Sequence, residues 1–289
     1  MSSVLGQYSL AAVPTIRLWC SARDVAWTWS WQAYPGVWAF VVTVGFLVRA
    51  FRPIATDPMT VARRWRAFAG LSGLLLLWIS LDWPVGPLGA GYLASVDAVQ
   101  FIVLAMIVPP LLLAALDHAR VERAVRARPR AERLLERLTA PLPVMIAFTI
   151  VMIVTHVPAV VDGLMRSQGG AFLLDLSWLV SGIVFWWPVV VGIPDRPGFP
   201  GPMRLLYLFF GTQVHLFIGT WLLVVHFPVY GTYELATRVS GLSALTDQQV
   251  AGGIMVGLTE PIVFGAMTVV FFRWAKRSEA AALAAGMQA

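Results

Sequence analysis

The sequence predicts an all-α membrane protein built as a bundle of seven transmembrane helices. Three observations carry this prediction: an apolar composition, seven apolar stretches long enough to cross a bilayer, and basic residues confined to alternate loops. Of the 289 residues, 58% are hydrophobic and only 12% are charged, with 13 Trp. An ordinary soluble domain has roughly 25% charged residues, and it could not bury so much apolar surface.

The seven stretches follow one another along most of the chain. They lie near residues 35–51, 66–82, 95–116, 141–161, 171–194, 204–227 and 248–272. A hydrocarbon core about 30 Å thick needs about 20 apolar residues at helical rise. Each stretch is expected to be a helix, because backbone polar groups in lipid must be satisfied within the segment. Pro109 and Pro110 lie inside the third stretch and predict a kink that opens space between helices.

Charge predicts the orientation of the bundle. All but four of the 21 Lys and Arg residues fall in the loops after the first, third and fifth stretches or after the seventh stretch. The four exceptions are Arg17, Arg23, Arg166 and Arg238. The positive-inside rule therefore places the N-terminus outside and the C-terminus in the cytoplasm. The net charge of +6 is explained by a cytoplasmic basic surface that faces anionic lipids, so no nucleic-acid partner is expected.

The segments that flank the helices have their own patterns. Residues 1–34 are expected to form an outer N-terminal interfacial segment rich in Trp, and residues 35–273 the transmembrane domain. Within it, residues 117–138 alternate apolar side chains with Arg and Glu, which is typical of an amphipathic helix on the inner membrane surface and equally of a solvated basic loop. Residues 274–289 are expected to be a cytoplasmic tail. Cys20 is the only cysteine, so no internal disulfide can form.

The chain has no P-loop, nucleotide fingerprint or Ser/His/Asp signature, and we expect no enzymatic activity. Polar residues instead gather at the predicted outer ends of the helices. Ionisable groups near membrane depth often mark a site, which predicts an outward-facing pocket or docking surface. Helix capping is the alternative explanation, and for Asp247 it is an equally good one. The predicted surface comprises Asp162, Tyr230, Asp247, Gln248 and Gln249.

Six motifs in order resemble the CtaG-type cytochrome c oxidase assembly factors, from about Trp27 to Arg273. They are LDWPVGPL from Leu81, PPLLL from Pro109, HVPAVVDGLM from His156, FWWPVVVGIP from Phe185, FPVYG from Phe227 and DQQVAGGIM from Asp247. The resemblance implies a multi-pass protein of the bacterial cytoplasmic membrane. It also implies a role in maturation of the copper centre of the oxidase at the outer face, with membrane lipids and an oxidase subunit or copper chaperone as partners.

The resemblance also suggests a copper site, with His156 as the best match to a family histidine. The tentative metal ligands are His156, His226, Asp97, Asp175 and Met255. The chain departs from the family at three positions, where Asp97, Phe101 and Asp175 replace family histidines. Carboxylates suit Cu(I) poorly, so the departures weaken the predicted copper site. For Met255, packing within the helix bundle is the favoured explanation.

Three hypotheses follow from these residues. The chain assists loading of the oxidase copper centre, or it is a metal-free protein that binds a respiratory subunit, or it is a small cation or metal transporter. The transporter would use Asp97, Asp175 and His215 along its path. His215 lies in mid-span near Gln213, and such a buried polar pair more often makes hydrogen bonds between helices. The ordered motifs favour the first hypothesis, and the replaced histidines favour the second.

Overall fold

A computed structural model describes residues 17–22, 25–51, 61–128, 130, 132–133, 137, 139–191, 199–239 and 241–286. Within these residues the chain forms helices and no strand. The elements are α1 (Pro35–Ala50), α2 (Val61–Leu81), α3 (Val85–Gly91), α4 (Ala94–Ile102), the π-helical turn η1 (Val103–Ile107), α5 (Val108–Ala114), α6 (His118–Arg126), α8 (Pro141–Val154), α9 (Pro158–Met165), α10 (Gln168–Val190), α11 (Gly201–Val224), α12 (Gly231–Glu234) and α13 (Ala244–Gly286).

The helices confirm an all-α, multi-pass membrane protein. Four helical stretches are long and apolar enough to cross a bilayer: α4 to α5, α10, α11 and α13. Two bent pairs, α2 with α3 and α8 with α9, bring the number to six if each pair is one span, with bends of 50° and 72°. The remaining apolar helix, α1, has 16 residues and is shorter than a typical span. A total of seven spans and their orientation therefore stay predictions.

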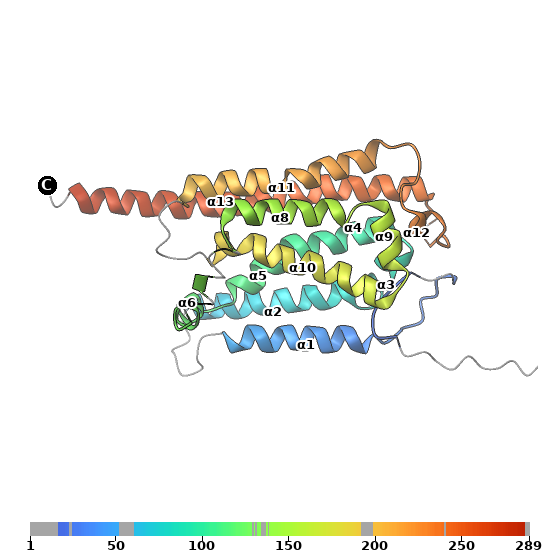
Figure 1. Ribbon diagram of the computed structural model, residues 1–289, viewed down its shortest axis with the longest axis horizontal. Helices are drawn as coiled ribbons and strands as arrows, with labels where there is room; N and C mark the ends of the chain where they lie inside the picture. The colour runs from blue at the N-terminus through green and yellow to red at the C-terminus, as the bar shows by residue number, and fades with distance from the viewer. Residues whose placement is uncertain are drawn as a thin grey trace, which may run out of the picture.

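The long helices run side by side, with the connections gathered at two ends (Figure 1). We call the end with α3, α9 and α12 the α3 end, and the opposite end, with α6, the α6 end. At the α6 end, α13 extends beyond the bundle and continues as helix through Gly286. The expected tail 274–289 is thus largely an extension of this helix. Of the predicted amphipathic segment 117–138, α6 covers residues 118–126, and much of the remainder lies outside the described residues.

The prolines of the third stretch are accommodated by a π-helical turn. In η1 the N–H of Val108 donates to the carbonyl of Val103, five residues earlier. Helix α10 packs closely there: a Cβ added to Gly182 would lie 2.5 Å from the Ala105 carbonyl oxygen and 2.8 Å from Cγ of Pro109. The expected opening between helices is therefore filled by close packing at Gly182. The widened turn is the local irregularity that Pro109 and Pro110 produce.

Helices α11 and α13 approach each other through glycines. A Cβ on Gly219 would lie 2.9 Å from the carbonyl oxygen of Gly252, and a Cβ on Gly252 would lie 2.5 Å from that of Gly219. Small residues allow helix backbones in membranes to approach closely. This contact fixes the register of the two helices, because Gly219 of α11 lies directly against Gly252 of α13.

Candidate functional site

The acidic residue Asp247 lies in the first turn of α13 but caps a different helix. Its Oδ2 accepts a hydrogen bond of 2.6 Å from the N–H of Ala94, and its Oδ1 accepts from the N–H and the hydroxyl of Ser95. These groups belong to the first turn of α4, which has orphan N–H donors and a positive dipole end. Helix capping therefore accounts for Asp247, but the helix that it caps is α4 and not α13, to which it belongs.

The other residues of the predicted docking surface also tie segments together. Asp162 on α9 accepts from the backbone N–H groups of Gly231 and Thr232, and so caps α12. Gln248 accepts from the N–H of Val229 at 2.6 Å. The Tyr230 hydroxyl donates to the carbonyl of His156 at 3.1 Å. Gln249 is half-buried in α13. At least four of the five residues thus hold the α3 end in shape, and their use in docking stays a prediction.

Asp175 and Asp97 lie within a buried polar cluster at the α3 end. The indole N–H of Trp19 donates to Oδ2 of Asp175 at 2.8 Å, and the amide Nε2 of Gln100 lies 3.4 Å from Oδ1. Asp97 precedes Gln100 by three residues on α4, and its carboxylate lies near the hydroxyl of Tyr233 of α12. Burial, together with the Asp97 carboxylate, raises the pKa of Tyr233, so the hydroxyl stays protonated.

The N-terminal segment 17–22 closes this cluster, which the sequence did not predict. Besides the Trp19 indole, the backbone N–H groups of Leu18 and Trp19 donate to Oε1 of Gln168. The N–H of Ala22 donates to the carbonyl of Met165. These contacts join residues about 150 positions apart, so no local pattern could have revealed them. The segment is held against the beginning of α10.

His156 lies at the bend between α8 and α9, and its imidazole faces the bundle core. Its Nδ1 lies 2.7 Å from the carbonyl oxygen of Met152. A carbonyl only accepts, so Nδ1 carries the proton and Nε2 keeps a lone pair. The ring makes a T-shaped contact with Phe101 at 4.9 Å between centroids.

His215 of α11 lies against the same phenylalanine and is fully buried. Its ring stacks on Phe101 at 5.2 Å between centroids, and its Nδ1 lies 3.0 Å from the carbonyl of Thr212. The Nε2 of His215 is buried and has no hydrogen-bond partner in the described part of the chain. The hydrogen bonds that the pair of His215 and Gln213 was expected to make to other helices are not seen among the described residues, because both side chains bond to carbonyls of α11 itself.

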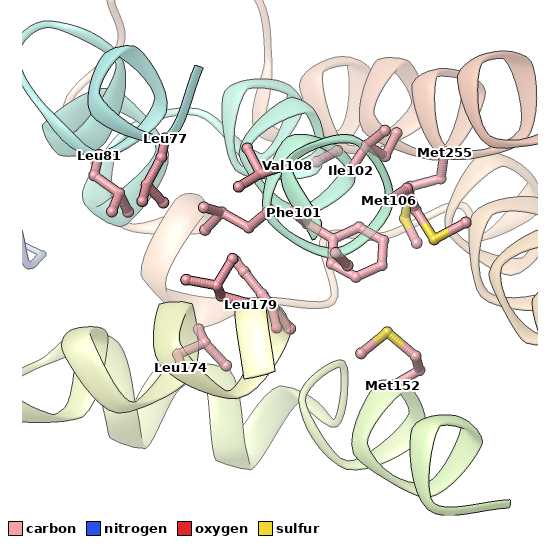
Figure 2. Packing of buried hydrophobic residues seen from close by; sticks show 14 of the residues in the cluster. Leu77, Leu81, Phe101, Ile102, Met106, Val108, Met152, Leu174, Leu179 and Met255 are labelled. Atoms are coloured by element: carbon pink, nitrogen blue, oxygen red, sulfur yellow. The ribbon is translucent and has the colours of Figure 1, made fainter. Parts of the chain in front are cut away.

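Three methionines project into the same part of the core. Met106 of η1, Met152 of α8 and Met255 of α13 are fully buried, and Figure 2 shows their side chains directed toward the region around Phe101. Together with His156 and His215 they form what we call the soft-donor core. The sequence indicated His156 and Met255, but it did not indicate that His215 and two further thioethers share their surroundings. A buried histidine in mid-span was the one available hint.

The five predicted metal ligands do not come together. Among the described residues no group of three or more His, Cys, Asp and Glu side chains could hold a metal ion. His226 is exposed beyond α11, whereas Asp97 and Asp175 belong to the cluster around Gln100. His156 and Met255 alone face the soft-donor core. Ligation by any of the five stays a prediction.

Comparisons with known proteins place most of the chain in one family. The profile described as cytochrome c oxidase caa3 assembly factor (Caa3_CtaG) matches residues 38–277. Uncharacterized proteins of Mycobacterium bovis and Mycobacterium tuberculosis are each 26% identical over 141 residues, which is 48% of this chain and 21% of theirs. One of Mycobacterium leprae is 23% identical over 279 residues, or 88% of this chain and 40% of that protein. The chain thus spans less than half of these relatives, and no solved structure matches it.

Proposed function

Because the chain belongs to the cytochrome c oxidase caa3 assembly factor family, we propose that it assists maturation of the oxidase copper centre at the outer face of a bacterial cytoplasmic membrane. Its role is non-catalytic, with Cu(I) as cargo and an oxidase subunit or a copper chaperone as partner. Seven spans with the N-terminus outside would place the α3 end at that face, where the copper centre is assembled.

The soft-donor core is the observation that carries this proposal. Thioether and imidazole ligands suit Cu(I), whereas carboxylates do not. The Nε2 of His215 carries a buried lone pair that no described residue meets, which is unfavourable unless a ligand uses it. His156 has its Nδ1 committed to a carbonyl, so its Nε2 is the atom available to a metal. The donor set therefore fits Cu(I), even though the predicted carboxylate ligands do not join it.

The residues of the core have distinct roles in this proposal. His215 and His156 offer nitrogen donors, and Met106, Met152 and Met255 offer sulfur donors from three helices. Phe101 contacts both imidazoles and, with Trp178 at 5.3 Å between centroids, keeps the core apolar. An apolar surrounding protects Cu(I) from water and from harder competing ligands.

Deletion of the gene tests the proposal in the cell. The strain is expected to lose caa3-type oxidase activity and the copper content of the purified oxidase, and added copper is expected to restore part of both. Complementation with the wild-type chain should restore both, and complementation with His215→Ala should restore less. Gln213→Ala is the matched control, because this neighbour on α11 donates to the Phe209 carbonyl of its own helix. Full oxidase copper in the deletion strain would contradict the proposal.

Metal-free docking is the second candidate function. It is favoured by the absence, among the described residues, of any three-residue His, Cys, Asp or Glu group. In this case the ordered α3 end, stabilised by Asp162, Asp247 and Gln248, would bind an oxidase subunit. Copurification of the oxidase with a His156→Ala/His215→Ala variant that also supports full oxidase copper content would favour docking alone.

A further inference from the structure

The buried polar cluster at the α3 end has two acceptor atoms that the described chain leaves unsatisfied. Oδ1 of Asp97 and Oε1 of Gln100 are both buried without a hydrogen-bond partner, and the Gln100 side chain is only 3% exposed. A buried acceptor that nothing meets is unfavourable, because it has lost its hydrogen bonds to water. Two orphan acceptors in one cluster can be met by a bound cation or by a proton on Asp97.

The two orphan oxygens line one small region. Asp97 and Gln100 are three residues apart, on one face of α4. A Cβ added to Gly89 of α3 would collide with Oε1 of Gln100 and lie 3.3 Å from Cα of Asp97. The carbonyl of Gly89 also accepts from the Tyr233 hydroxyl at 2.8 Å. Gly89 therefore lets the backbone of α3 pack against α4 at this point, and its carbonyl and the Tyr233 hydroxyl lie beside the two acceptors.

Charge in this region is unbalanced. Asp97 and Asp175 are close enough to interact electrostatically, and in the described part of the chain neither forms an ion pair with Lys or Arg. Asp175 is satisfied by the Trp19 indole and the Gln100 amide, both neutral donors. A buried carboxylate pair without a basic partner is strongly unfavourable unless a cation or a proton neutralises it.

We propose that Asp97, Gln100 and the Gly89–Tyr233 pair form a binding site for a hard cation such as Na⁺ or Ca²⁺. Carboxylate, amide, carbonyl and hydroxyl oxygens are the ligands that hard cations prefer. Gln100 links the site to Asp175, because its Nε2 donates to Asp175 while its Oε1 belongs to the proposed cation site. The site is separate from the soft-donor core, although Asp97 precedes Phe101 by one turn of α4. It stands whether or not the chain handles copper.

Thermal unfolding of the full-length protein in nanodiscs tests this site, followed by intrinsic Trp fluorescence. NaCl and CaCl₂ are compared with choline chloride at equal ionic strength. In the wild type, at least one of the two salts is expected to raise Tm saturably above the choline value. In Asp97→Asn this increase is expected to vanish, while Tm in choline rises because a buried charge is removed. Asp162→Asn, at the same end but within the α12 cap, should keep the increase.

Direct binding of radioactive Na⁺ or Ca²⁺ to the wild type provides a measurement that does not depend on any variant folding. About one ion per chain is expected, with affinity weakened about tenfold or more by Asp97→Asn. If neither cation binds and neither raises Tm above choline, the proposal is overturned and a proton fills the site. An equal Tm increase in Asp97→Asn would also overturn it.

Discussion

Asp247 accepts hydrogen bonds from a helix other than its own, and this is typical of the acidic residues at the α3 end. The carboxylate belongs to α13, yet the donors are the first N–H groups of α4 and the Ser95 hydroxyl. The interaction therefore links two helices about 150 residues apart in the chain. A polar residue in an aromatic and apolar surrounding can thus serve the fold rather than a ligand.

Replacement of Asp247 by Ala is expected to lower the free energy of unfolding by about 1–3 kcal/mol. The change removes a cap and leaves buried N–H groups of α4 without an acceptor. Unfolding by SDS titration in mixed micelles measures the effect. Gln249→Ala, two residues further along the same helix, is the control and should change little. Equal values for the two variants would contradict the capping role.

At the scale of elements, the contact between α11 and α13 depends on the absence of side chains at one crossing. Gly219→Ala is expected to lower the free energy of unfolding by about 1–3 kcal/mol, because the added Cβ would overpack against Gly252 and Met255. Gly253→Ala and Gly257→Ala are matched controls, since an added Cβ at either position meets nothing within 4 Å. The same SDS titration compares the three; a tolerated Gly219→Ala would show that the helices do not cross there.

The N-terminal segment 17–22 is a second element whose position can be tested, because it carries the single cysteine. The Cys20 thiol is buried and lies 3.4 Å from the carbonyl oxygen of Leu81. Burial, with Asp175 and Asp82 nearby, raises its pKa, so little thiolate exists near neutral pH. Maleimide labelling of the folded protein should therefore be slow at both pH 7 and pH 8. Rapid labelling that matches the SDS-unfolded chain would show that the segment is not docked.

For the whole molecule, the predicted topology places the α3 end outside and the α6 end in the cytoplasm. Alkaline phosphatase fused within residues 235–243 should be active, and green fluorescent protein fused after the C-terminus should fluoresce, because each reporter works on one side of the membrane. Arg and Lys near the α6 end, such as Arg63, Arg64 and Arg273, provide the physical reason. The opposite pattern of reporter activity would show that the bundle is inserted with the α3 end in the cytoplasm.

Much of this architecture was accessible from sequence, and the reason is physical. Long apolar runs indicate burial in lipid, and most of the helices begin and end within a few residues of the predicted stretches. The exceptions are the fourth stretch, which is divided between α8 and α9, and the seventh, because α13 continues through Gly286. Shorter helices such as α3 and α12 were missed, because distant residues contact them: Asp162 caps α12, and the Tyr233 hydroxyl donates to Gly89 of α3. The soft-donor core was only half predicted: the approach of His215 to Phe101 depends on how α11 packs on α4, which no single helical period reveals.

The copper content of the purified full-length protein after reconstitution with Cu(I) tests the central claim most directly. Competition with a colorimetric Cu(I) chelator measures both the stoichiometry and the affinity. The account predicts about one Cu(I) per chain, weakened strongly in His215→Ala and in His156→Ala and unchanged in His226→Ala, whose imidazole is exposed outside the core. Absence of bound Cu(I) in the wild type, or binding that survives loss of both core histidines, would contradict it.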